Sequence, residues 1–289
     1  MSAMSERYDR AAERYGTWWA PVLEAAALRV LDRAAQALPQ DEPRGERSPA
    51  ILDVGTGTGT LALGAVRRWP AAVVTGLDAS RGMVREARRR VTTDLDSYDA
   101  TRMSFVVADA SPLPFGDRTF DLVVSSFVLQ LVPDRLAVFR EAHRVLRPGG
   151  QLAFVTWMVA ESKFPPDEAF FDVLDDLDVP DDDAGEEACS GDFVSAKAAA
   201  GQLRRAGFRD VTAREEWLEY AFEPARYPDF LEEYGEYELF RSLPWSLRRR
   251  VRRAARKRLA ALPESDFRWR APIVMAVARR PEGGPGELS

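Results

Sequence analysis

Cysteine is almost absent from this sequence, since Cys189 is the only one among 289 residues. No intrachain disulfide can form, which fits a reducing compartment. The first residues, MSAMSERYDRAAERYG, are polar and include acids, unlike a secretory signal peptide. No apolar run approaches the roughly 20 residues that a membrane-spanning helix needs. We therefore expect a cytoplasmic protein without a membrane span.

Positive charge is not in excess either. The formal net charge is -6, and lysine occurs only at Lys163, Lys197 and Lys257. Binding to the phosphate backbone of a nucleic acid requires a surplus of positive charge, so the composition disfavours nucleic acid as a partner. The chain also has a single histidine, and we expect no metal site. Its hydrophobic fraction of 46% is that of an ordinary globular protein.

One segment, RRRVRRAARKR at 248–258, is strongly basic. Its apolar residues recur every four positions, at Leu247, Val251, Ala255 and Leu259. This spacing predicts an amphipathic helix with a solvated basic face. Alternatively, the basic face neutralises the acidic stretch 172–187 or contacts an anionic substrate. The acidic stretch itself is typical of a solvated loop.

From Ile51 onward, short apolar runs alternate with helical segments. The runs are AILDV, AVVTGLD, SFVVAD, FDLVVSSF and QLAFVTW. Helical stretches around 60–69, 80–91 and 134–146 separate several of them. This alternation predicts a parallel sheet with helices on both faces.

The flanking regions are less regular. We expect a helix over 5–38 and a polar, proline-rich linker over 39–49. After Trp157 we expect helices at 167–177, 195–206, 227–242 and 245–261. We expect strands at 211–221 and 271–280. The tail from Pro281 is predicted to be disordered.

The stretch ILDVGTGTG runs from the first predicted strand into a loop with Gly55, Gly57 and Gly59. A phosphate-binding P-loop would continue with lysine and serine or threonine, but Thr60 and Leu61 follow here. The dinucleotide fingerprint GxGxxG fails because position 60 is threonine. What is left is GxGxG, which lets the chain turn sharply and lets a ligand lie on bare backbone.

Acidic residues end three successive predicted strands, at Asp53, Asp78 and Asp109. Ligands of open α/β sheets bind over the carboxyl ends of the strands. An acid at Asp78 can accept hydrogen bonds from both hydroxyls of a ribose, and one at Asp109 can accept the amino proton of adenine. Asp53 beside the glycine loop suits the amino acid end of a ligand. Ribose, adenine and an amino acid together describe S-adenosylmethionine.

The motifs ILDVGTGTG, VTGLDAS, ADASPLPFGDRTFDLVVSSFVLQLVPD and EAHRVLRPGGQLAF resemble those of class I S-adenosylmethionine-dependent methyltransferases. The similarity extends over 45–160 and is strongest to the small-molecule, ubiquinone/menaquinone-type branch. It implies a Rossmann-like, doubly wound, mostly parallel seven-stranded α/β sheet with the last strand antiparallel. It also implies one domain over 1–289, with an N-terminal helical lid at 1–44, acceptor-pocket helices and the last strands at 161–280, and the tail at 281–289.

The resemblance also implies which residues hold the cofactor. Asp53, Gly55 and Gly57 would flank its methionine part, with Ser126 near the same end. The remaining positions would surround the adenosine or shape the loop, namely Thr56, Gly59, Asp78, Ala79, Met83, Asp109 and Ala110. One departure concerns the segment after the fourth strand, where many relatives read LHH and this chain reads Leu129, Gln130 and Leu131. No histidine role is expected there.

A catalytic base is not evident. The only histidine, His143, lies late in the helix that returns from the fourth strand, so we expect it at the opposite edge of the sheet from the cofactor. The candidates for contact with an acceptor are Tyr15 in the lid, Gln130 after the fourth strand and Trp157 at the end of the fifth. Each of these side chains has packing or helix capping as its alternative role.

The function that the sequence predicts is methyl transfer from S-adenosylmethionine to a small, partly aromatic or apolar metabolite by in-line displacement. Methyl transfer asks little of side chains beyond positioning and the exclusion of water. Two alternatives stay open. One is an RNA or protein methyltransferase that docks through the basic helix, and the other is a non-catalytic module that only binds the cofactor.

Overall fold

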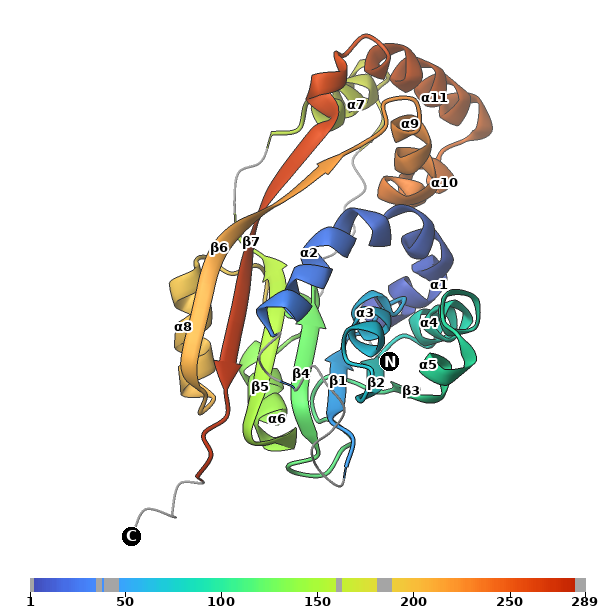
Figure 1. Cartoon of the computed structure of the whole chain (residues 1–289). Helices are drawn as coiled ribbons and strands as arrows, with labels where there is room; N and C mark the ends of the chain where they lie inside the picture. The colour runs from blue at the N-terminus through green and yellow to red at the C-terminus, as the bar shows by residue number, and fades with distance from the viewer. Residues whose placement is uncertain (1–2, 35–37, 39–46, 160–162, 181–188, 284–289) are drawn as a thin grey trace.

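The computed structural model describes residues 3–34, 38, 47–159, 163–180 and 189–283. A seven-stranded sheet has the order β3-β2-β1-β4-β5-β7-β6 (Figure 1). The strands are β1 (Ala50–Val54), β2 (Val73–Asp78), β3 (Met103–Val107), β4 (Phe120–Ser126), β5 (Leu146–Trp157), β6 (Arg209–Ala221) and β7 (Arg268–Arg279). The first five strands pair in parallel, and β7 runs antiparallel to both β5 and β6. The predicted mostly parallel sheet with its antiparallel last strand is confirmed.

Both faces of the sheet are covered by helices, as expected for strands that are apolar on both sides. On one face, α2 (Ala20–Arg33) and α3 (Thr60–Arg68) share a core with β1 through residues such as Val30, Leu61 and Ile51. On the other, α6 (Arg135–Val145) and α8 (Ala196–Arg205) share a core with Leu52 and Phe154. The neighbours Ile51 and Leu52 point to opposite cores because successive strand side chains alternate.

Local sequence signals explain where several helices begin. Ser80 accepts a hydrogen bond from the Met83 amide at 3.0 Å and caps α4 (Arg81–Asp94). Asp134 caps α6 and Ser195 caps α8 in the same way, each binding the amide three residues on. A short helix, α5 (Ser97–Thr101), precedes β3 and was not predicted.

The strands β6 and β7 extend beyond the rest of the sheet and carry a group of helices at their far end (Figure 1). We call this group the helical cap. It consists of α7 (Pro165–Asp176), α9 (Tyr227–Phe230), a π-helical turn η1 (Leu231–Gly235), α10 (Tyr237–Ser242), α11 (Trp245–Leu259) and η2 (Glu264–Phe267). Its own core contains Phe170, Tyr227 and Phe240. The N-terminal helix α1 (Ala3–Trp18) lies between this cap and α4 (Figure 1).

Two predicted helices are divided in the structure. The helix expected over 5–38 is two helices, α1 and α2, which meet at Trp19. The indole of Trp19 stacks on Phe230 and Tyr234 of the cap, at 6.0 Å between ring centroids in each case. The helix expected over 227–242 is α9, η1 and α10 in succession.

The basic run forms α11, as its apolar stripe predicts, and Val251, Ala255 and Leu259 are buried. Its charged face is not simply solvated. Arg258 forms ion pairs with Asp172 and Asp176 of α7, while Arg252 pairs with Glu232 and Arg256 with Asp229. The start of the acidic stretch is therefore helical and paired with arginine, and its residues 181–187 lie outside the described ranges.

Most of the predicted linker, at 39–46, and the end of the predicted tail, at 284–289, also lie outside the described residues. Among the residues that the structure does describe, no helix has the length and apolar character needed to cross a membrane.

Candidate functional site

The glycine loop connects β1 to α3 and wraps over the end of β2. Gly55, Gly57 and Gly59 have φ angles of 70°, 54° and 88°, a region in which residues with a side chain are strained. A Cβ at Gly55 would lie 2.2 Å from Cγ2 of Val128, so only glycine fits there. A Cβ at Gly57 would meet no atom within 4 Å. The backbone at Gly57 is thus open to a ligand.

Asp53 lies beneath this loop and is only 1% exposed. Its Oδ2 accepts hydrogen bonds from the Thr56 hydroxyl at 2.7 Å and from the Ala62 amide at 3.1 Å. Its Oδ1 is buried without a hydrogen-bond partner among the described residues. Burial raises the pKa of Asp53 to about 7. The carboxyl group therefore organises the loop and the start of α3 from the inside.

Asp78, at the end of β2, holds the other side of the loop. Its Oδ2 accepts a hydrogen bond from the Gly57 amide at 2.8 Å, and its Oδ1 accepts one from the Ser80 amide at 2.9 Å. Burial raises the pKa of Asp78, although these two hydrogen bonds act in the opposite direction. Asp78 also lines the cavity described next, so it borders this cavity as well as the loop.

A cavity of about 490 Å³ lies over the carboxyl ends of β1, β2, β3 and β4. The loop after each strand supplies part of its wall, and α1 covers it. Of the residues predicted to bind the cofactor, it is lined by Gly55, Gly57, Asp78, Ala79, Met83, Asp109, Ala110 and Ser126. The structure thus brings together residues from four strand ends that are up to 71 positions apart in sequence, as between Gly55 and Ser126.

Three predicted residues do not line this cavity, namely Asp53, Thr56 and Gly59. Asp53 and Thr56 bind each other below the loop. Gly59 begins α3, and a Cβ there would lie 3.3 Å from the Cβ of Ala87 in α4. These three residues therefore support the loop and do not form part of the cavity wall.

Other wall residues were not predicted from the sequence, and they include Met4, Ser5, Ser80, Ser111, Val128, Leu131 and Val132. Ser80 and Ser111 each stand two positions after a predicted acid, and that position is a signal that identifies them. The others depend on how α1 and the segment after β4 fold back over the sheet, for which the sequence carries no local pattern.

Aromatic residues close the cavity on the side of the helical cap. Tyr8 and Tyr15 of α1 and Phe127 after β4 line it. The rings of Tyr8 and Tyr15 lie 6.1 Å apart, and Tyr15 contacts Tyr234 of the cap at 6.2 Å. Phe127 has a φ of 55°, an unfavourable conformation for a bulky side chain. Such strain is commonly kept at functional sites.

Of the three weak catalytic candidates, only Tyr15 lines the cavity. The side-chain amide of Gln130 donates to the Phe127 carbonyl at 2.7 Å and accepts from the Thr156 hydroxyl at 2.6 Å. Both polar groups of the Gln130 side chain are thus hydrogen-bonded within the protein, and Gln130 does not line the cavity. Trp157 packs behind Phe127, with ring centroids 4.4 Å apart, and also does not reach the wall.

His143 is also far from the cavity wall. It packs edge-to-face on Phe208, with ring centroids 5.2 Å apart, beside the turn at Gly207 that joins α8 to β6. Burial lowers the pKa of His143, and the nearby guanidinium groups of Arg280 and Arg209 lower it further. The ring is therefore a packing element at the amino-terminal edge of the sheet.

The sequence is similar to those of known methyltransferases. A family model described as a methyltransferase domain matches residues 51–150. A ubiquinone/menaquinone biosynthesis C-methyltransferase from Desulfotalea psychrophila is 35% identical over 170 residues, which cover 56% of this chain and 66% of that protein. A 27-O-demethylrifamycin SV methyltransferase from Amycolatopsis mediterranei is 39% identical over 144 residues, covering 48% of each chain.

The match thus spans 48% to 66% of the length of these curated relatives, and it is centred on the cofactor-binding half of the chain. Among solved structures, the YcgJ protein from Bacillus subtilis superposes with a TM-score of 0.55 at 17% identity, over 90% of this chain and 100% of that one. At that identity the likeness is one of fold.

Proposed function

The chain belongs to the class I S-adenosylmethionine-dependent methyltransferase family, and we propose that it binds S-adenosylmethionine in the 490 Å³ cavity and methylates a small, partly aromatic or apolar metabolite. The observation that carries this proposal is the convergence of Gly57, Asp78 and Asp109 on one cavity at the carboxyl edge of the sheet. A fold alone does not define chemistry, and these residues are what suit the cavity to this cofactor.

The residues present fit this cofactor. The cavity has the size of a typical small-molecule site. The Asp78 carboxylate would accept hydrogen bonds from the ribose hydroxyls, and Asp109 with Ala110 would bind the adenine. The bare backbone at Gly57 would lie against the methionine part of the cofactor.

The acceptor side of the cavity supports a neutral and partly apolar substrate. Tyr8, Tyr15, Phe127 and Leu131 line it there, and each presents an aromatic ring or an aliphatic chain. The two curated relatives are named for a quinone-pathway C-methylation and for a rifamycin. Both names describe small organic acceptors, which supports the same class here and leaves carbon, oxygen and nitrogen as possible nucleophiles.

The chain's own contribution would be positioning. The cofactor, when bound, supplies a methyl group on an already activated sulfonium. Tyr8 and Tyr15 would exclude water from above, and Phe127 would hold the flat face of the acceptor. Burial raises the pKa of Tyr15 well above its ordinary value, so this phenol is neutral near pH 7 and is no general base there.

The alternatives differ from this proposal in their acceptors. Docking of RNA on α11 is disfavoured because three of its arginines already pair with acids of the cap. A module that only binds the cofactor would have the same cavity and would show no turnover.

Calorimetry and radiolabel transfer test the proposal together. S-adenosylmethionine and S-adenosylhomocysteine should bind, whereas NAD and ATP should bind far more weakly. Methyl-labelled cofactor should then be offered with small-molecule extract, with RNA and with protein, in separate reactions. Label in the small-molecule fraction supports the proposal, and label in RNA or protein supports the corresponding alternative. Tight NAD binding without any response to S-adenosylmethionine would overturn it.

A further inference from the structure

The helix α1 covers the cavity although it is itself poorly buried. Only Ser5 and Ala12 are buried among its described residues. Its second half is attached to the helical cap, where Trp18 donates a 3.1 Å hydrogen bond to Glu233 and packs edge-to-face on Phe230. Its first half carries Tyr8, which lines the cavity, and it needs a separate attachment to the core.

Asp9 makes that attachment. Its Oδ1 accepts hydrogen bonds from the Ser80 hydroxyl at 2.5 Å and from the Gly82 amide at 2.8 Å. Because these donors stand at the amino terminus of α4, the helix dipole also favours a carboxylate here. Burial alone would raise the pKa of Asp9, but the hydrogen bonds from Gly82 and Ser80 bring it below its ordinary value.

The contact is close enough to need glycine at the partner position. A Cβ added at Gly82 would lie 2.6 Å from the backbone oxygen of Asp9 and 2.9 Å from its Cα. The backbone of α1 therefore rests directly on the first turn of α4. Any side chain at position 82 must push α1 outward.

Asp78, the residue proposed to bind the ribose, lies in the same segment as Ser80 and Gly82, and we call residues 78–82 the ribose loop. Asp78 accepts from the Ser80 amide, and the Ser80 hydroxyl donates to Asp9 while accepting from the Met83 amide at 3.0 Å. Ser80 thus connects the carboxylate that faces the cavity with the carboxylate that holds α1. A displacement of this loop would therefore alter the positions of both Asp78 and Asp9.

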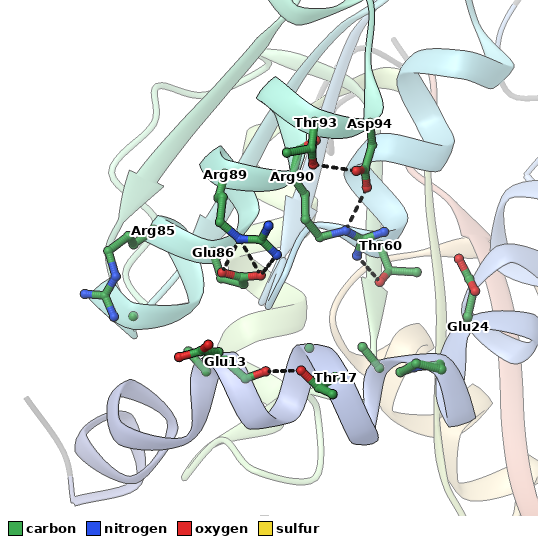
Figure 2. Close-up of a pocket in the computed structure, with 15 residues that line it drawn as sticks. Glu13, Thr17, Glu24, Thr60, Arg85, Glu86, Arg89, Arg90, Thr93 and Asp94 are labelled. Carbon is green, nitrogen blue, oxygen red and sulfur yellow. Dashed lines mark hydrogen bonds and ion pairs between the residues drawn. The ribbon is translucent and has the colours of Figure 1, made fainter. Parts of the chain in front are cut away.

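Behind the contact, the α1–α4 interface opens into a polar crevice of about 670 Å³. Figure 2 shows Glu13 and Thr17 of α1 facing the ion pair of Glu86 with Arg89 on α4 across this space. That ion pair is formed within α4, so it does not join α1 to α4. The Asp9 contact is a direct polar attachment between the first half of α1 and the amino terminus of α4.

We propose that Asp9 is a positioning residue that latches α1 over the cofactor cavity by binding Ser80 and Gly82 of the ribose loop. The inference rests on the proposed function for the identity of the ligand. With the latch formed, Tyr8 covers the cavity and the ligand is enclosed. With the latch broken, α1 swings on its attachment to the cap, and the ligand enters or leaves.

The test compares rates of ligand exchange in two latch variants and a control. Asp9→Ala removes the acceptor, and Gly82→Ala displaces Asp9 while improving the helix propensity of α4. Glu13→Ala, one turn further along α1, removes a carboxylate that faces only the crevice (Figure 2). Labelled S-adenosylhomocysteine is bound to each protein, and its release is followed after dilution into unlabelled ligand. Trypsin cleavage after Arg7 and Arg10 reports exposure of α1.

Asp9→Ala and Gly82→Ala should release S-adenosylhomocysteine on the order of tenfold faster, since a charged acceptor of two hydrogen bonds is lost or displaced. The association rate should be unchanged or higher, and α1 should be cleaved faster. Asp9→Asn should release the ligand at a rate between those of the wild type and Asp9→Ala, because its amide oxygen still accepts hydrogen bonds. Glu13→Ala should match the wild type. A merely structural defect of the loop would instead slow association.

Release at the wild-type rate from folded Asp9→Ala or folded Gly82→Ala would overturn the latch. If Asp9→Ala does not fold, as judged by circular dichroism, Gly82→Ala decides alone. Failure of the wild-type protein to bind S-adenosylhomocysteine at all would instead count against the proposed function. The trypsin comparison between the free variants then still tests the attachment of α1.

Discussion

The Asp53 carboxylate accepts a 2.7 Å hydrogen bond from the hydroxyl of Thr56, three residues further along the chain, within the loop and below the cavity. Both residues are buried. Asp53 thereby shapes the glycine loop from below. It would act on a bound ligand indirectly, through the loop backbone that it holds in place.

Stability should depend on pH through Asp53. Burial raises its pKa from 3.8 to about 7, so the folded protein binds this proton more tightly than the unfolded chain. Its contribution to stability is complete below the unfolded value and is lost as the pH rises through about 7. Asp53→Asn does not titrate, so its melting temperature should fall less than that of the wild type between about pH 5 and about pH 8. Thermal melts across this range check it, and parallel curves would contradict the assignment.

Removal of the Asp78 carboxylate should weaken cofactor binding. Hydrogen bonds to a charged acceptor are worth about 1.5–3 kcal/mol each, so Asp78→Ala should reduce the affinity for S-adenosylhomocysteine at least about tenfold. Calorimetry gives the affinity, and circular dichroism checks the fold. Asp32→Ala, an exposed acid on α2, is the matched control and should bind like the wild type. Unchanged affinity in Asp78→Ala would show that β2 does not end at the ribose.

Gln130 should matter for stability and little for binding. Gln130→Ala leaves the Phe127 carbonyl and the Thr156 hydroxyl without their buried partners. Each such group costs about 1–3 kcal/mol, so the free energy of unfolding should fall by roughly 2 kcal/mol or more. Urea denaturation measures this. A folded variant with wild-type stability and lost turnover would return Gln130 to the catalytic candidates.

Tyr15 should act through its ring. Tyr15→Phe keeps the contacts with Tyr8 and Tyr234 and should retain most of the turnover, because the neutral phenol is no base near pH 7. Tyr15→Ala opens the cavity to water and should reduce turnover far more. Steady-state kinetics with the identified acceptor compare the two. An equal and large loss in both would assign the chemistry to the hydroxyl.

His143→Gln should keep nearly all turnover. The imidazole packs on Phe208 and lines no part of the cofactor cavity. Removal of a true general base typically reduces the rate about 10²–10⁴-fold, so the two outcomes are well separated. Initial rates across a pH series check the prediction. A hundredfold loss with intact cofactor affinity would restore a histidine-base mechanism.

Much of the fold could be predicted from short-range patterns. The apolar runs that became β1, β2 and β4 are followed by the glycine loop, by the capping residue Ser80 and, a few residues later, by the capping residue Asp134. The prediction of a single helix over 227–242 was wrong, because the segment forms α9, η1 and α10. Tyr234, inside η1, stacks on Trp19 between α1 and α2, and no local pattern encodes a partner so distant in sequence.

The sequence by itself determined the sheet, the glycine loop and the strand-end acids, because alternating hydrophobicity and the backbone freedom of glycine act over a few residues. Only the tertiary structure decided which of these groups face the cavity. Asp78 lines it whereas Asp53 turns under the loop, and Gln130 is taken up by Thr156. It also placed Asp9 on Gly82, a contact that exists only because two helices approach without a side chain between them. Such choices depend on burial and on the pairing of polar groups across the whole molecule, which no short stretch contains.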